Sequence, residues 1–99
     1  MIELKTATLD DFSPLEGRVV TIEPSIDEAA FEATLIEASS GVDPARKNEF
    51  ALLFRANQTG DPIEQQICKI VGDGFGDMEL FLVPIGTTDG HPDYEAVFT

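Results

Sequence analysis

The sequence contains a single cysteine, no tryptophan and only six basic residues, against 19 acidic ones. One cysteine, Cys68, can form neither a disulfide within the chain nor a zinc site built from several cysteine ligands. The net charge of −13 disfavours nucleic acid and anionic membranes as partners, because their phosphates need lysine and arginine to replace counterions. Basic protein surfaces and cations are the partners that suit this charge.

Long apolar runs are also absent. The longest one, Leu80 to Ile85, is far shorter than a membrane-spanning helix. Met1 to Lys5 lack the basic-then-apolar order of a signal peptide. We therefore expect a cytoplasmic location, or delivery as part of an assembly. The 99 residues, 42% of them hydrophobic, are enough for one domain with one core over residues 1–99.

The spacing of apolar residues changes at Gly17. Before it, Leu9, Phe12 and Leu15 recur at every third position, which predicts a short helical cap within residues 1–17. After it, apolar residues alternate with polar ones, and turns rich in glycine, proline and aspartate separate the alternating segments. The strands predicted in this way cover residues 18–23, 31–35, 49–55, 63–71, 78–85 and 94–99.

Six strands at this spacing predict a mainly β fold, an antiparallel meander over residues 18–99. The helical patterns are too short to act as crossovers in a parallel sheet. A small six-stranded antiparallel barrel or a compact sandwich, with a short N-terminal helical cap, avoids exposed edges best. The strand period does not distinguish these two. Residues 78–85 are apolar on both faces and are expected to form the most buried strand.

Few residues suggest chemistry. The only histidine, His91, stands between Asp89 and Asp93 and could be a base oriented by a carboxylate. No neighbouring serine or cysteine offers a nucleophile, so a solvated turn is the favoured interpretation. Cys68 lies in the middle of a predicted strand and is interpreted as a packing residue. We expect no catalytic residue, no cofactor and no enzyme activity.

Residues 72–77 alternate glycine with Asp73, Phe75 and Asp77. Their carboxylates argue against a phosphate-binding loop, and the acids lack the order of an EF-hand loop. We favour a bulged turn in which Phe75 packs back onto the core. No metal site is predicted, and calcium binding at Asp73 and Asp77 remains an open alternative.

Ile36, Leu53 and Val97 lie on strand faces opposite an apolar set. Either a helix covers the outside of a closed barrel, or this outer face meets another chain. We predict contact residues at Ile36, Leu53, Phe75 and Val97.

Three segments, Phe50 to Arg55, Leu80 to Gly86 and Tyr94 to Phe98, stand out together with the leucine and phenylalanine residues of the N-terminal segment. Through them, nearly the whole chain resembles a family of small bacterial domains of unknown function. Members of that family have no established activity, and an association with phage-tail-like or fibre assemblies would imply an accessory role.

These observations favour a non-enzymatic structural or protein-interaction module that docks on a larger assembly or self-associates. The first alternative is an acidic decoy or inhibitor that binds a basic protein surface. The second is a weak metal-binding domain. Each would act on a protein or a cation, without nucleic acid or membrane as a partner.

Overall fold

The computed structural model describes residues 8–26, 29–40 and 49–98. Within them an α-helix, α1 (Leu9–Phe12), and a 3-10 helix, η1 (Ser13–Leu15), precede six strands. The strands are β1 (Val19–Pro24), β2 (Phe31–Ser40), β3 (Phe50–Ala56), β4 (Gln66–Gly72), β5 (Gly76–Thr88) and β6 (His91–Phe98). The chain is mainly β, as predicted. In this described part of the chain, no helix is long and apolar enough to cross a membrane.

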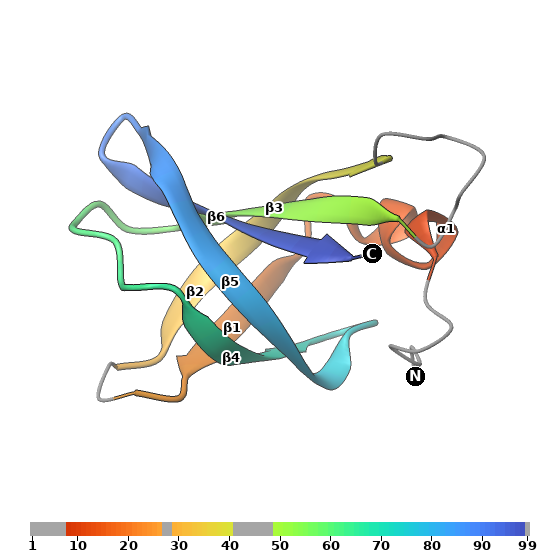
Figure 1. Cartoon of the computed structure of the whole chain (residues 1–99), viewed down its shortest axis with the longest axis horizontal. Coiled ribbons are helices and arrows are strands. Elements are labelled where there is room, and N and C mark those ends of the chain that lie inside the picture. Colours follow the sequence, from red (N-terminus) through yellow and green to blue (C-terminus); the bar gives the residue numbers. More distant parts are fainter. Residues whose placement is uncertain (1–7, 27–28, 41–48, 99) are drawn as a thin grey trace.

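The strands close into a barrel in the order β1-β2-β3-β6-β5-β4, with every neighbouring pair antiparallel. Closure leaves neither sheet edge unpaired, and the fold is therefore the barrel rather than the sandwich. The predicted simple meander is wrong at one connection. β3 pairs with β6 and not with β4, so residues 57–65 cross one end of the barrel to reach β4 (Figure 1).

Two of the strands that run further than the sequence predicted, β2 and β5, each contain a bulge. The register of β2 shifts between Leu35 and Glu37, and that of β5 shifts between Pro84 and Gly86. A bulge adds a residue and bends the strand without ending the ladder. β2 therefore extends to Ser40, five residues beyond the predicted strand over residues 31–35. Residues 41–48, which follow it, lie outside the described residues.

The helical cap plugs the end of the barrel opposite to residues 57–65 (Figure 1). The ring of Phe12 is fully buried, with its centroid 5.4 Å from that of Phe50, 5.6 Å from Phe98 and 6.2 Å from Phe75. Aromatic pairs at such separations add to the free energy gained from burial alone. The predicted role of the N-terminal segment as a cap is thus confirmed for its described residues.

The core is the inside of the barrel, and its residues follow the alternation of the strands. In β3, for example, the side chains of Phe50, Leu52 and Phe54 are buried. The expectation that residues 78–85 would be buried on both faces is wrong. Phe81 and Ile85 each remain 52% exposed, because no helix or strand among the described residues packs on the outside of the barrel wall at β5.

Candidate functional site

The residues that suggested chemistry have structural roles. His91 Nδ1 lies 3.0 Å from the carbonyl oxygen of Ala56, so its ring fastens the β5–β6 turn to the end of β3. Cys68 is fully buried inside the barrel, and this burial raises the pKa of its thiol to about 11. The interpretation of Cys68 as a packing residue is confirmed.

Residues 72–77 form the tight turn between β4 and β5. The amide of Phe75 donates to the carbonyl oxygen of Gly72 at 3.0 Å, and Gly72 pairs with Gly76. Phe75 is fully buried, which confirms that it packs back onto the core. Its predicted role as a contact residue is therefore wrong, because it offers no surface to a partner.

Asp73 and Asp77 lie exposed in this turn. Across residues 8–26, 29–40 and 49–98, no three His, Cys, Asp or Glu side chains are grouped so that they could hold a metal ion. Calcium binding at these two carboxylates thus has no third acidic, histidine or cysteine side chain among the described residues to support it.

An ionic cluster on the barrel wall was not predicted from the sequence. Arg55 and Asp93 pair across β3 and β6, and Arg55 Nε donates to Asp93 Oδ1 at 2.7 Å. Thr88 Oγ1 donates to Asp93 Oδ2 at 2.7 Å and accepts from Arg55 Nη2 at 3.2 Å. Burial alone raises the pKa of Asp93, but these hydrogen bonds and the charge of Arg55 outweigh burial, so the pKa lies below its usual value.

Arg55 on β3 is distant in the sequence from Thr88 and Asp93, which lie on either side of the β5–β6 turn, and the pairing of β3 with β6 brings them together. Because the charge of Arg55 is largely balanced by Asp93, the cluster is better suited to hold β3, β5 and β6 together than to bind an anion.

The outer wall carries an apolar strip that crosses four neighbouring strands. Ile67 on β4 stands directly opposite Phe81 on β5. One row further along, Val83 on β5 is opposite Glu95 on β6, which is in turn opposite Leu53 on β3. Extending the β5–β6 register by two residues brings Val97 level with Phe81. We define the apolar strip as Leu53, Ile67, Phe81, Val83, Ile85 and Val97.

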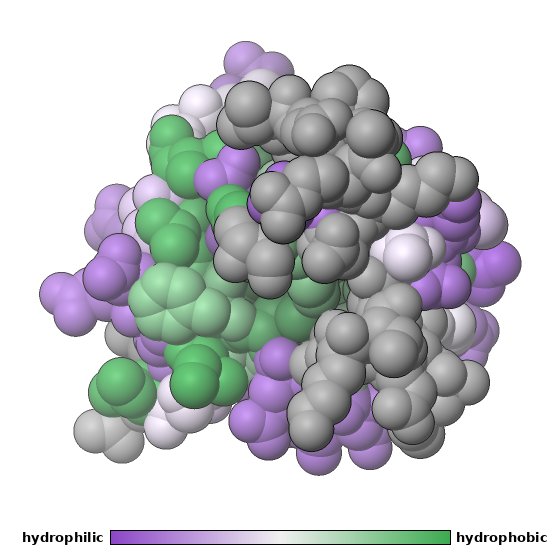
Figure 2. All heavy atoms as spheres, turned by 45° about the vertical axis from the view of Figure 1, so that its right-hand side comes forward, coloured by the Kyte–Doolittle hydropathy of each residue, from purple (hydrophilic) through white to green (hydrophobic). Residues whose placement is uncertain are grey.

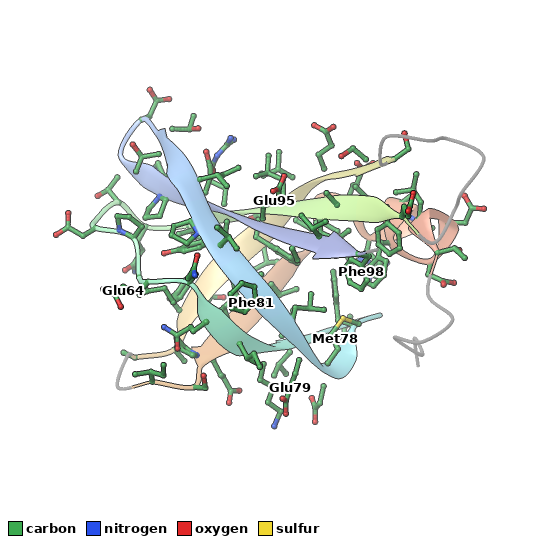
Figure 3. All side chains as sticks on the ribbon, in the orientation of Figure 1. Glu64, Met78, Glu79, Phe81, Glu95 and Phe98 are labelled. Carbon is green, nitrogen blue, oxygen red and sulfur yellow. The ribbon has the colours of Figure 1, made fainter. Side chains whose placement is uncertain are left out.

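Four members of the strip are at least half exposed: Ile67 50%, Phe81 52%, Ile85 52% and Val97 61%. Figure 2 shows hydrophobic side chains gathered on one part of the surface with hydrophilic ones around them. Figure 3 places Glu95 and Glu79 on either side of Phe81. The strip is thus apolar, with Glu95 between Val83 and Leu53 and with the Lys69–Glu79 pair at its border.

Two of the four predicted contact residues, Leu53 and Val97, belong to this strip. Ile36 is 38% exposed but lies at the bulge of β2, beside a shallow depression that Arg55 and His91 also line. The sequence analysis missed Ile67, Phe81 and Ile85. The signal was present, since Asp77, Glu79, Phe81 and Val83 alternate with buried residues along β5.

The cap does not cover the strip. The large side chains of α1 and η1, Phe12 and Leu15, are buried in the core, and Figure 1 shows both helices at the end of the barrel. Of the two alternatives for the outer apolar face, a covering helix is not found among the described residues.

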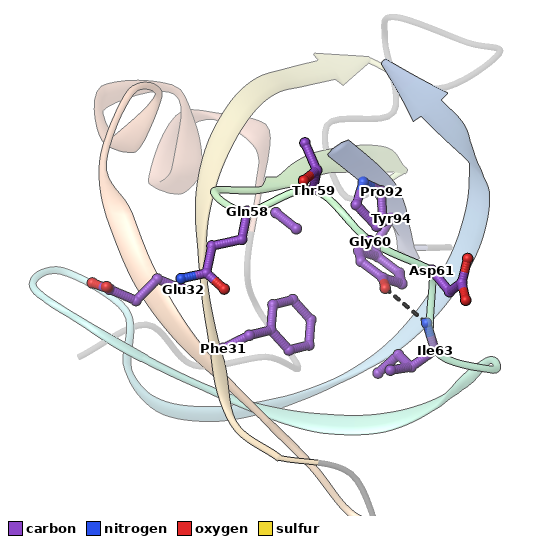
Figure 4. Close-up of a pocket in the computed structure, with 10 residues that line it drawn as sticks. Phe31, Glu32, Gln58, Thr59, Gly60, Asp61, Ile63, Pro92 and Tyr94 are labelled. Carbon is purple, nitrogen blue, oxygen red and sulfur yellow. Dashed lines mark hydrogen bonds between the residues drawn. The ribbon is translucent and has the colours of Figure 1, made fainter. Parts of the chain in front are cut away.

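The barrel end opposite the cap contains a cavity of about 170 Å³. Its walls come from the start of β2, the connection between β3 and β4, and the start of β6. Figure 4 shows the rings of Phe31 and Tyr94 at this cavity, with centroids 5.7 Å apart. The lining residues are Phe31, Glu32, Ala56, Gln58, Thr59, Gly60, Asp61, Ile63, Pro92 and Tyr94.

With this geometry in place, the comparison with known families can be stated. Residues 7–98 match a family model described as a domain of unknown function, DUF6916. The chain belongs to the DUF6916 family. The match confirms the sequence-based resemblance to an uncharacterised domain family, and it covers every strand of the DUF6916 barrel described above. No curated protein and no solved structure matches the chain.

Proposed function

We propose that this DUF6916 domain is a non-enzymatic protein-interaction module that docks on a larger protein through the apolar strip. The observation that supports the proposal is the exposure of Ile67, Phe81, Ile85 and Val97 on adjacent strands, over which no helix of the described residues lies. Fully burying a large apolar side chain contributes about 1.5–3 kcal/mol. Covering four half-exposed ones would therefore supply a substantial part of a binding free energy.

The closed barrel limits the mode of contact. Partners often bind sheet proteins by adding a strand to a free edge, but every strand here already has two neighbours. Strand addition is therefore not available, and docking on the barrel wall relies on its side chains, of which the strip offers the largest apolar ones.

Charge favours a different protein over a second copy of this chain. Glu95 lies within the strip, and Glu37 and Glu79 stand beside its members Leu53 and Phe81. Two copies meeting face to face would bring these carboxylates together, on chains that each carry a net charge of −13. A partner with an apolar ridge bordered by lysine or arginine would complement both features. A fibre or tail-like assembly, suggested by the sequence resemblance, is the first place to look for it.

Co-purification from the source cell tests the proposal. Phe81→Ser removes the central strip residue, and Val19→Ser is the matched control, because Val19 is 50% exposed on β1, outside the strip. We expect Phe81→Ser to lose a protein that both wild type and Val19→Ser retain. Equal retention by the two variants would contradict the proposal. Both variants should stay folded and melt cooperatively, because each position is about half exposed and lies outside the core.

Measurements at low and high salt distinguish the proposal from two alternatives, self-association and an acidic decoy. Self-association through the strip predicts an oligomer by light scattering that persists from low salt to about 0.5 M salt, whereas our proposal predicts a monomer. An acidic decoy, favoured by the net charge of −13, predicts partner binding that weakens steeply over the same range. Docking through the strip predicts much weaker salt dependence.

A further inference from the structure

We propose that the cavity at the open end of the barrel binds one cationic side chain, arginine or lysine, of a partner protein. Its size sets the class of ligand. At about 170 Å³ it is smaller than typical small-molecule sites of about 300 Å³ or more. It is comparable to a cavity of about 150 Å³ that admits a benzene-sized group. One amino-acid side chain fits this space, and a nucleotide or a large cofactor does not.

The walls of the cavity suit both the methylene groups and the positive charge of an arginine or lysine side chain. Phe31 and Tyr94 present two aromatic rings tilted by 40°, and Ile63 and Pro92 complete an apolar lining. A cation is attracted to an aromatic face within about 6 Å of the ring centroid, and the apolar lining accepts the methylene groups.

The charged side chains around the cavity favour a positively charged ligand. Among the described residues, the acidic side chains that line the cavity are Glu32 and Asp61, and no lysine, arginine or histidine lines it. Figure 4 shows their carboxylates on opposite sides of the mouth, directed outward. Their negative potential adds to that of a chain with a net charge of −13. An anionic ligand is therefore disfavoured, and an approaching cation is attracted.

Three hydrogen bonds fix the position of residues 57–65, the segment that crosses this end of the barrel. The amide of Asn57 donates to the carbonyl of Glu32 at 2.9 Å, and the amide of Gly60 donates to the carbonyl of Gly90 at 3.1 Å. The amide of Ile63 donates to the Tyr94 hydroxyl at 2.9 Å. A preformed site loses less conformational entropy when it binds a ligand, so the cavity is prepared for an occupant.

Short peptides test this assignment. The probe is acetyl-Gly-Arg-Gly-amide, and the matched control contains citrulline, which has nearly the same shape without the charge. In NMR titrations we expect the arginine peptide to shift the resonances of Phe31, Gly60 and Tyr94, with an affinity roughly three- to tenfold higher than the citrulline peptide. A lysine peptide should also bind. Equal affinity for arginine and citrulline, or no shift at these residues, would overturn the proposal.

Variants of the cavity residues separate the contribution of the aromatic rings from that of the carboxylates. Phe31→Leu keeps an apolar wall and removes one aromatic face, so it should weaken arginine binding and leave citrulline binding nearly unchanged. The double variant E32Q/D61N should also weaken arginine binding. The control D73N/D77N changes the net charge equally, but in the β4–β5 turn, and should bind as wild type does. If both double variants weaken binding equally, the charge at the mouth has no specific role and the proposal fails.

The cavity and the apolar strip are independent surfaces. Phe81→Ser should leave arginine-peptide binding unchanged, since Phe81 does not line the cavity. Failure of the peptide titration would contradict the cavity proposal but not docking through the strip. Likewise, retention of the partner by Phe81→Ser would contradict docking through the strip but not the cavity proposal.

Discussion

Ile67 and Phe81 face each other across the β4–β5 ladder, and about half of each side chain is in contact with solvent. Directly paired apolar residues on a sheet stabilise one another, but these two bury only part of their surface by doing so. An uncovered apolar pair within a larger apolar strip is a feature of surfaces that meet another molecule. The same register places Lys69 opposite Glu79 one row away, so the apolar surface ends sharply at charged residues.

The first prediction concerns the contact between the β4–β5 turn and the cap. Gly74 has φ +89°, and a Cβ there would lie 2.6 Å from Leu15 Cδ2. Gly17 has φ +88° with nothing within 4 Å of such a Cβ. Both Gly→Ala variants should lose about 1 kcal/mol from backbone strain. Gly74→Ala should lose about 1 kcal/mol more, because Leu15 must move.

Urea unfolding of both variants measures this difference. A double variant, G74A/L15A, supplies the control: if the clash with Leu15 causes the extra loss, the two substitutions will be less than additive. Equal destabilisation by Gly74→Ala and Gly17→Ala would show that the cap does not pack tightly against the turn.

The second prediction concerns pH and Asp93. The pKa of this carboxyl is lower in the folded protein than its usual value. Its contribution to stability is therefore fully present above the unfolded pKa of about 3.9 and is lost as pH falls through the folded pKa. Asp93→Asn should cost about 1–2 kcal/mol at pH 7, because Arg55 loses a charged acceptor.

Chemical denaturation at several pH values tests this sign. The stability gap between wild type and Asp93→Asn should narrow below about pH 4 and close below the folded pKa. Asp89→Asn, at an exposed neighbouring position, is the control and should show little effect. A gap that stays constant with pH would mean that the Arg55–Asp93 pair does not stabilise the fold through its charge.

The third prediction uses Cys68 as a reporter of unfolding. Its thiol is fully buried, and burial raises the pKa to about 11, so little thiolate is present at pH 8. A thiol reagent should modify the native protein only through opening of the barrel, at a rate that rises with urea as the open population grows. Rapid labelling without denaturant would show that β4 opens locally.

The sequence predicted those parts of the fold that depend on local alternation. Phe50, Leu52 and Phe54 repeat every second residue, and this spacing alone places them on one face of a strand. Leu9, Phe12 and Leu15 likewise indicated the cap. The pairing of β3 with β6 was not predicted, because it joins residues about 40 positions apart and no local pattern specifies which distant strands will meet.

The same distinction applies to the candidate sites: local patterns indicate part of the apolar strip but not the cavity. The alternation along β5 is enough to predict that Phe81 lies on the outer face. It was missed because residues 78–85 were expected to be buried on both faces of the strand. The cavity could not be found from sequence, since Phe31, Gly60 and Tyr94 come from three segments that meet only after the barrel closes. Phe75 was assigned both to the core and to a contact surface, because a single aromatic residue in a glycine-rich turn has no period that fixes its direction.

Photo-crosslinking in the source cell tests the docking surface most directly. A photoreactive phenylalanine analogue would replace Phe81 in one protein and Val19 in another, since both positions are about half exposed and only Phe81 belongs to the strip. Docking through the strip predicts one discrete crosslinked protein from position 81 and none from position 19. The same product from both positions, a crosslinked second copy of this chain, or no product from position 81 would contradict it.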